Sequence, residues 1–133
     1  MDAAQVMNNL WIGGWSAARD YGHMFDVIIN VAKDAPDHGS HYKFSLVDGP
    51  CEQQPEFEAA VNCIGPEFSS GRRVLVHCVA GYSRSLVSAA KAVSIATNEP
   101  FDNVLERFKK ARGCDPVRPK CPHEAMLILA RGG

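Results

Sequence analysis

A histidine, a cysteine, an arginine and a serine gather in one short segment, residues 77–85, with the sequence HCVAGYSRS. Cys78 is a potential nucleophile, and Arg84, six positions later, carries a planar guanidinium that matches two oxygens of a phosphate group. An apolar run, residues 74–76, precedes the segment, and helix-forming residues follow it. The spacing predicts a strand-to-helix loop that binds a tetrahedral dianion above a thiol.

The backbone of this loop can complete the anion site. A cysteine at the start of a helix lies near unpaired N–H groups and the positive end of the helix dipole, which stabilise its thiolate. Gly81 supplies the backbone freedom that a tight cradle requires, and Ser85 can donate a hydrogen bond to the sulfur. The predicted phosphate-binding residues, whose N–H groups can turn inward, are Val79, Ala80, Gly81, Tyr82, Ser83 and Arg84.

The same arrangement predicts a two-step reaction. Attack by Cys78 on phosphorus gives a cysteinyl-phosphate, which water then hydrolyses. The leaving oxygen needs a proton, so a carboxylic acid is expected on a facing loop. Asp48 is the best candidate, because it follows a predicted strand and the Gly49-Pro50 pair keeps its loop compact. Weaker candidates in neighbouring loops are Asp34, Asp37 and Glu52.

Length and composition indicate one domain over residues 1–133, long enough to form a core without disulfide support. The net charge of -1 argues against nucleic acid or an anionic membrane as a partner. No apolar run approaches the ~18 residues that a membrane span needs, and the first residues do not resemble a secretory signal. We expect a cytoplasmic monomer.

Five cysteines in no close-spaced pattern argue against a secreted disulfide scaffold and favour a reducing compartment. Cys114, Cys121 and His123 could suggest a zinc site. Six residues separate the two cysteines and no second close pair exists, so a zinc site is disfavoured. The sequence predicts no metal and no organic cofactor.

Strand and helix patterns alternate along the chain. They predict an α/β fold with a central, mostly parallel twisted sheet of about four to five strands flanked by helices. The predicted strands are residues 10–12, 25–31, 42–47 and 73–78. The predicted helices are residues 16–21 (capped by Ser16), 55–68 (with a break or kink at Gly65-Pro66), 85–97, 101–111 (capped by Asp102 or Asn98) and 122–130.

The segment His77-Cys78-(five residues)-Arg84-Ser85 resembles the active-site loop of cysteine-dependent protein tyrosine phosphatases, and most closely that of the small, atypical dual-specificity phosphatases. The resemblance extends along the chain. Residues 9–13 are similar to the opening strand and turn of the family, and residues 25–31 to its next strand. Asp48 lies 30 positions before Cys78, where the family places its general acid, and residues 117–119 are similar to its C-terminal region.

The resemblance implies a role for each matching residue. Cys78 is the nucleophile, Arg84 binds the phosphate, and Asp48 is the acid and then the base that activates water. Ser85 assists breakdown of the intermediate, and His77 supports the thiol through hydrogen bonds. The implied substrates are phosphotyrosine and phosphoserine or phosphothreonine in proteins. Some family members also protect an oxidised nucleophile with a disulfide, for which Cys51 and Cys63 would be the candidates.

Other functions stay open at this stage. The loop side chains Val79, Ala80 and Tyr82 are neutral, which disfavours a phosphoinositide phosphatase, and a basic surface for an RNA 5′-phosphatase is not evident. A non-catalytic module that holds phosphorylated partners is a further alternative. The cationic residues Arg107, Lys109, Lys110 and Arg112 are interpreted as a solvated helix face.

Overall fold

The computed structural model describes residues 1–114 and 121–132. Five strands form one sheet in the order β1-β2-β5-β3-β4. They are β1 (Ala3–Met7), β2 (Leu10–Gly13), β3 (Val27–Ala32), β4 (Tyr42–Leu46) and β5 (Val74–His77). All neighbouring pairs are parallel except β1 with β2. The predicted α/β fold with a mostly parallel sheet is therefore confirmed.

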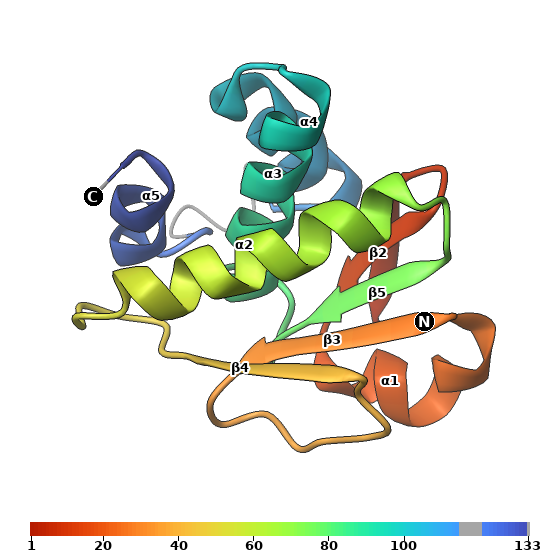
Figure 1. Cartoon of the computed structure of the whole chain (residues 1–133). Helices are drawn as coiled ribbons and strands as arrows, with labels where there is room; N and C mark the ends of the chain where they lie inside the picture. The colour runs from red at the N-terminus through yellow and green to blue at the C-terminus, as the bar shows by residue number, and fades with distance from the viewer. Residues whose placement is uncertain (115–120, 133) are drawn as a thin grey trace.

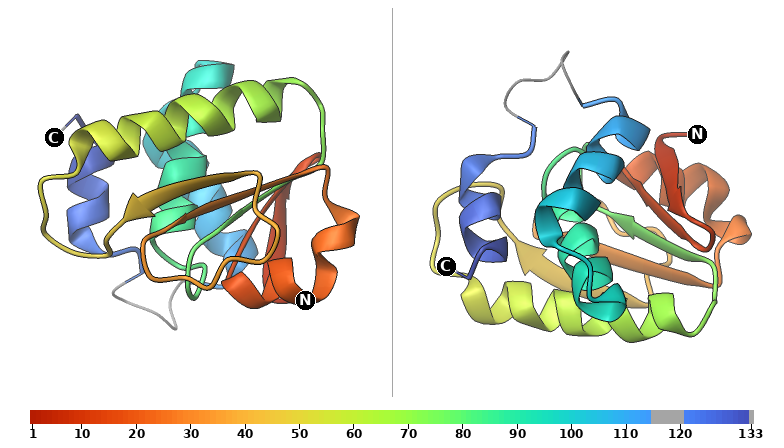
Figure 2. Two further views of the ribbon diagram at one scale, coloured as in Figure 1. Left: turned by 60° about the horizontal axis from the view of Figure 1, so that its bottom comes forward. Right: turned by 90° about the horizontal axis from the view of Figure 1, so that it is seen from above.

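The helices cover both faces of this sheet (Figures 1 and 2). One face packs against α1 (Trp15–Tyr21), which continues into the 3₁₀ turn η1 (Gly22–Met24). The other face packs against α2 (Gln54–Ser69) and α3 (Arg84–Thr97). Two further helices, α4 (Phe101–Arg112) and α5 (Glu124–Ala130), pack against α3.

Burial on both faces explains the composition of the inner strands. All six residues of β3 and all four of β5 are buried, and such strands read as continuous β-branched runs because neither face meets water. The edge strand β1 is only half-buried and was not predicted. Its polar and small residues carry no strong strand signal, and its place depends on antiparallel pairing with β2.

A break at Gly65-Pro66, one of the two predicted outcomes, is wrong, because α2 is a single helix that continues to Ser69. A kink there stays a prediction. Proline in a helix removes one hydrogen bond and crowds the carbonyl one turn earlier. Pro66 lies in the last turn and Asn62, one turn before it, is exposed, so water can reach that carbonyl.

The predicted caps of two helices and the predicted start of a third also differ in the structure. The N-cap of α1 is Gly14, and Ser16 donates a hydrogen bond to Asp2 Oδ2 over 2.8 Å instead. Pro100 precedes α4 without a side-chain cap, whereas Asn98 ends α3 in the left-handed conformation. The last helix starts at Glu124, two residues after the predicted start, with its cap at His123.

The parallel strands bring distant residues to one edge of the sheet. β5 is the central strand, and its last residue, His77, pairs with Gly13 of β2 and Asn30 of β3. The loops that follow all these strands meet at this carboxyl edge, which is where ligands bind in open α/β sheets.

Candidate active site

The loop after β5 turns around the thiol of Cys78. The Cys78 side chain is buried, and its Sγ lies 3.3 Å from Ser85 Oγ. The backbone N–H of Gly81 donates to the same sulfur over 3.2 Å. Two donors, one from the loop backbone and one from the first turn of α3, can therefore stabilise negative charge on the sulfur. The predicted contact between Ser85 and Cys78 is present.

Gly81 allows the loop to close tightly. Its φ is +82°, a conformation that L side chains rarely adopt, and a Cβ at this position would lie 2.7 Å from both Gly13 O and Gly14 N. The loop also bonds to its surroundings through its ends, because Cys78 N donates to Gly13 O and Trp15 N donates to Val79 O. The cradle is thus held against the end of β2 and the start of α1.

Arg84, the first residue of α3, is buried beside this loop. Its Nη1 donates to the carbonyl oxygen of Leu46 over 2.9 Å and to Asp34 Oδ1 over 2.5 Å. Its Nε is buried and has no hydrogen-bond partner among the described residues. Buried guanidinium groups are normally satisfied, so this N–H is available to an anion.

Asp34 was considered above only as a weaker candidate for the acid. In the structure it is the partner of Arg84, and the hydrogen bond from Arg84 holds the pKa of Asp34 below its usual range. That effect favours the carboxylate over the protonated form that a general acid requires. Asp37 likewise accepts from Ser40, whose hydroxyl lowers its pKa.

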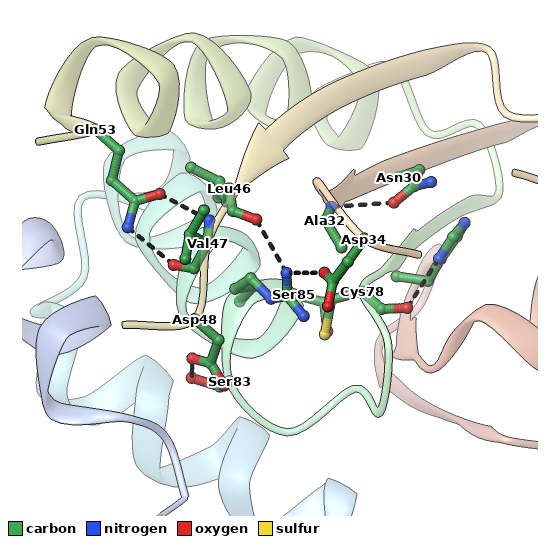
Figure 3. Close-up of polar contacts among 12 residues, drawn as sticks. Asn30, Ala32, Asp34, Leu46, Val47, Asp48, Gln53, Cys78, Ser83 and Ser85 are labelled. Atoms are coloured by element: carbon green, nitrogen blue, oxygen red, sulfur yellow. Dashed lines mark hydrogen bonds and ion pairs between the residues drawn. The ribbon is translucent and has the colours of Figure 1, made fainter. Parts of the chain in front are cut away.

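Asp48 approaches the loop from the end of the β4 segment. Its Oδ1 accepts a hydrogen bond of 2.6 Å from Ser83 Oγ, inside the predicted phosphate-binding segment, and Asp48 is otherwise exposed. Figure 3 shows Asp48 and Ser83 together at the loop that carries Cys78. The structure therefore places Asp48 against Ser83 of the loop and Ser85 against Cys78.

The loop that carries Asp48 is held by a residue that sequence reasoning missed. Gln53 is buried; its Oε1 accepts from Val47 N and its Nε2 donates to Val47 O, each over 2.8 Å. Nε2 also lies 3.2 Å from Gly49 O. A glutamine just before a helix gives no sequence signal for this role, because its bonds depend on where the loop returns.

His77 is buried and contacts the backbone of Cys78 rather than its sulfur. Its Nδ1 lies 3.2 Å from the carbonyl oxygen of Cys78, and its Nε2 has no partner among the described residues. Burial, the largest effect, lowers the pKa of His77. The imidazole is therefore neutral near pH 7, and the expected hydrogen-bonding support reaches Cys78 through the main chain.

The cysteines other than Cys78 fall into two groups. Cys114 and Cys121 form a disulfide, with Cα atoms 5.9 Å apart. The sequence pattern did not predict this bond, because two cysteines separated by six residues do not by themselves indicate a disulfide. Cys51 and Cys63 are free, and burial, with a smaller effect of Glu67, raises the pKa of Cys63 to about 11.

Arg112 corrects the interpretation of a solvated cationic face. Its side chain is only 8% exposed and donates to the carbonyl oxygens of Ala80 and Gly81.

Residues 117–119, part of the resemblance noted above, lie outside the described residues. Within the described ranges no group of three or more His, Cys, Asp or Glu side chains could hold a metal ion, and no helix is long and apolar enough to cross a membrane.

The structure thus has a mostly parallel sheet whose central strand runs into a cysteine-to-arginine loop. Solved structures of phosphatases share this fold. Human DUSP28 superposes with a TM-score of 0.77 at 17% identity, over 98% of this chain and 91% of that one. A mouse putative dual-specificity phosphatase complexed with zinc tungstate superposes with a TM-score of 0.75 at 20% identity. The match covers 98% of this chain and 84% of that one. The human tyrosine phosphatase-like serine/threonine/tyrosine-interacting protein superposes with a TM-score of 0.75 at 17% identity. The match covers 97% of this chain and 93% of that one.

The sequence comparison points the same way. Mouse dual specificity protein phosphatase 2 is 29% identical over 116 residues, which is 77% of this chain. The chain spans only 36% of the length of that relative. No family model matches the sequence. The resemblance stated from the sequence is thus confirmed, and the chain has the fold of the dual-specificity and tyrosine phosphatases.

Proposed function

We propose that the protein is a phosphomonoester hydrolase that dephosphorylates phosphotyrosine, and phosphoserine or phosphothreonine, in proteins through a cysteinyl-phosphate on Cys78. One observation carries this proposal: the buried Nε of Arg84, without a partner in the described chain, lies beside a loop whose Gly81 N–H points at the Cys78 sulfur. A phosphate oxygen would satisfy that donor, and its phosphorus would then lie within reach of the thiol.

A residue of the site has a role in each step of the proposed reaction. The Cys78 sulfur attacks phosphorus, and the bond from phosphorus to the leaving oxygen breaks as Asp48 gives that oxygen a proton. Arg84 and the loop N–H groups bind the charge that spreads over the equatorial oxygens. Water deprotonated by Asp48 then displaces sulfur from phosphorus. Ser85 stabilises the departing thiolate from 3.3 Å.

Two features of the site support a protein substrate over a phosphoinositide. The side chains of Val79, Ala80 and Tyr82 are neutral, and Asp34 places an additional negative charge next to Arg84. A head group with several phosphates would meet that carboxylate, whereas a single phosphoamino acid needs only one oxyanion site. We propose a cytoplasmic, monomeric enzyme that uses no metal.

The test compares intact chain with Cys78→Ser on an aryl phosphate without added metal. The intact chain should turn over and be inhibited by vanadate, and Cys78→Ser should bind phosphate but not turn over. Turnover that survives in Cys78→Ser would contradict the mechanism. A chain that binds phosphopeptides without turnover would be a non-catalytic module, and rates on phosphotyrosine, phosphothreonine and phosphoinositide substrates would identify the substrate class.

A further inference from the structure

Arg112, the last residue of α4, makes two hydrogen bonds to the outer side of the nucleophile loop. Its Nη2 donates to Ala80 O over 2.9 Å, and its Nε donates to Gly81 O over 3.0 Å. Its Cζ also lies 4.4 Å from the ring centroid of Tyr82. One guanidinium therefore donates hydrogen bonds to two consecutive carbonyl groups of the loop.

These bonds fix which way the loop peptides point. In a planar trans peptide the C=O and the following N–H point in opposite directions. The peptide between Ala80 and Gly81 shows this directly, because its oxygen accepts from Arg112 outside while its N–H donates to Cys78 Sγ over 3.2 Å inside. The next peptide is held in the same way by its oxygen, so the N–H of Tyr82 is directed away from Arg112.

The loop needs such a restraint. A glycine rotates its flanking peptides at low cost, and a rotated peptide at Gly81 would aim a carbonyl oxygen at the sulfur and at any bound oxyanion. A carbonyl dipole in that direction repels negative charge, whereas the N–H stabilises it. The cationic group behind the carbonyls makes the rotated state less favourable.

Arg112 is itself held by the start of the chain. Its Nη2 lies 2.7 Å from Asp2 Oδ1, and the other oxygen of Asp2 accepts from Ser16 Oγ at 2.8 Å. Asp2 O also accepts from Gly14 N over 3.0 Å. The residue before β1, the start of α1 and the end of α4 thus meet behind the loop.

We infer that Arg112 is a positioning residue that keeps the N–H of Gly81 directed at the Cys78 sulfur and the N–H of Tyr82 directed at the phosphate site, with Asp2 as its counter-ion. The inference deepens the proposed function and rests on it. It assigns phosphate affinity to a side chain that lies behind the loop, on the side opposite the thiol.

Binding of inorganic phosphate to the full chain, measured by calorimetry, tests this without turnover. Arg112→Lys keeps the positive charge but cannot donate to both carbonyl groups in the same geometry. We expect this variant to bind phosphate about tenfold more weakly. Arg112→Ala should bind about 100-fold more weakly. Added methylguanidinium should restore binding to Arg112→Ala. The matched controls are Arg107→Lys and Arg107→Ala, because Arg107 is on the same helix and pairs with Glu99.

The outcomes separate the two proposals. Phosphate binding by the Arg112 variants equal to that of the Arg107 variants would overturn the positioning role and leave the function standing. Weakened binding that methylguanidinium does not restore, together with a melting temperature below that of the controls, would mean that Arg112 is only structural and would also overturn it. If the intact chain binds no phosphate, the proposed function falls, and this inference falls with it.

Discussion

Asp34 Oδ1 lies 2.5 Å from Nη1 of Arg84, the guanidinium that we assign to phosphate binding. The arginine side chain is 7% exposed and the aspartate side chain 68% exposed. The pair thus joins a buried cation, which Leu46 O also holds, to a carboxylate at the surface. A substrate phosphate would share the arginine with that carboxylate.

Replacing Asp34 by Asn should tighten oxyanion binding. The amide oxygen can still accept from Arg84, so the guanidinium keeps its orientation, but the competing negative charge is gone. Asp34 itself is largely exposed, so water screens its charge and we expect only about a threefold to fivefold lower inhibition constant for vanadate. Asp37→Asn, in the same loop, is the control. Weaker vanadate binding in Asp34→Asn would instead show that the charge of Asp34 is needed.

Replacing Asp48 by Asn should slow the reaction according to the leaving group. We expect a loss of ~10²–10⁴-fold in kcat/KM on phenyl phosphate, whose phenoxide needs a proton. The loss on nitrophenyl phosphate should be much smaller, because nitrophenolate leaves without one. The comparison of both substrates in Asp48→Asn and Asp37→Asn checks this, and an equal loss on both substrates would move the acid elsewhere.

Replacing Ser85 by Ala should slow breakdown of the intermediate. The hydroxyl lies 3.3 Å from the sulfur, and the departing thiolate loses a hydrogen bond worth ~10- to 100-fold in rate. Stopped-flow measurement should show a burst of nitrophenolate before a slow steady state. Ser88→Ala is the matched control, because Ser88 is also buried in α3 but donates to Arg84 O. A uniform slowing without a burst would argue against this role.

Replacing Gly81 by Ala should cost more stability than the same change at Gly71. Both glycines have φ near +80° (+82° and +81°), so both substitutions carry backbone strain of ~1 kcal/mol or more. Only at Gly81 would the new Cβ meet the backbone of Gly13 and Gly14. Urea unfolding should place Gly81→Ala at least ~1 kcal/mol below Gly71→Ala. Equal losses would mean that the loop is not closed against β2.

His77 should make stability depend on pH below neutrality. Burial lowers its pKa in the folded state, so the unfolded chain takes up the proton first as the pH falls. The stabilisation from neutral His77 is full above the unfolded pKa of ~6.5 and is lost as the pH falls below it. The slope attributable to His77 is at most ~1.4 kcal/mol per pH unit. Urea unfolding of His77→Gln between pH 7 and pH 5 should lack this slope, whereas exposed His23→Gln should keep it.

Much of the site could be predicted because it is local. Cys78, Gly81, Arg84 and Ser85 lie within eight consecutive residues, and a strand followed by a helix fixes how such a loop turns. Asp48 could be added because parallel strands end at one edge of the sheet. The Asp48–Ser83 contact at 2.6 Å agrees with this expectation.

The contacts that support the loop could not be predicted in this way. Arg112 looked like part of a solvated face, because helical spacing alone does not say which cation a loop from another element will cover. Asp2, Asp34 and Gln53 are ordinary polar residues in sequence. The Asp2–Arg112 bond spans 110 positions and the Asp34–Arg84 bond spans 50.

The sequence by itself determined where the proposed nucleophile and the proposed phosphate-binding arginine lie and which chemistry they suit, since both depend on residue type and on spacing within one loop. Only the tertiary structure decided what holds them in place. The partners of Arg84 come from the loop after β3 and from β4, and Arg112, which bonds two loop carbonyls, comes from the end of α4. They meet only when the sheet edge and the helices pack, and that packing is a property of the whole chain.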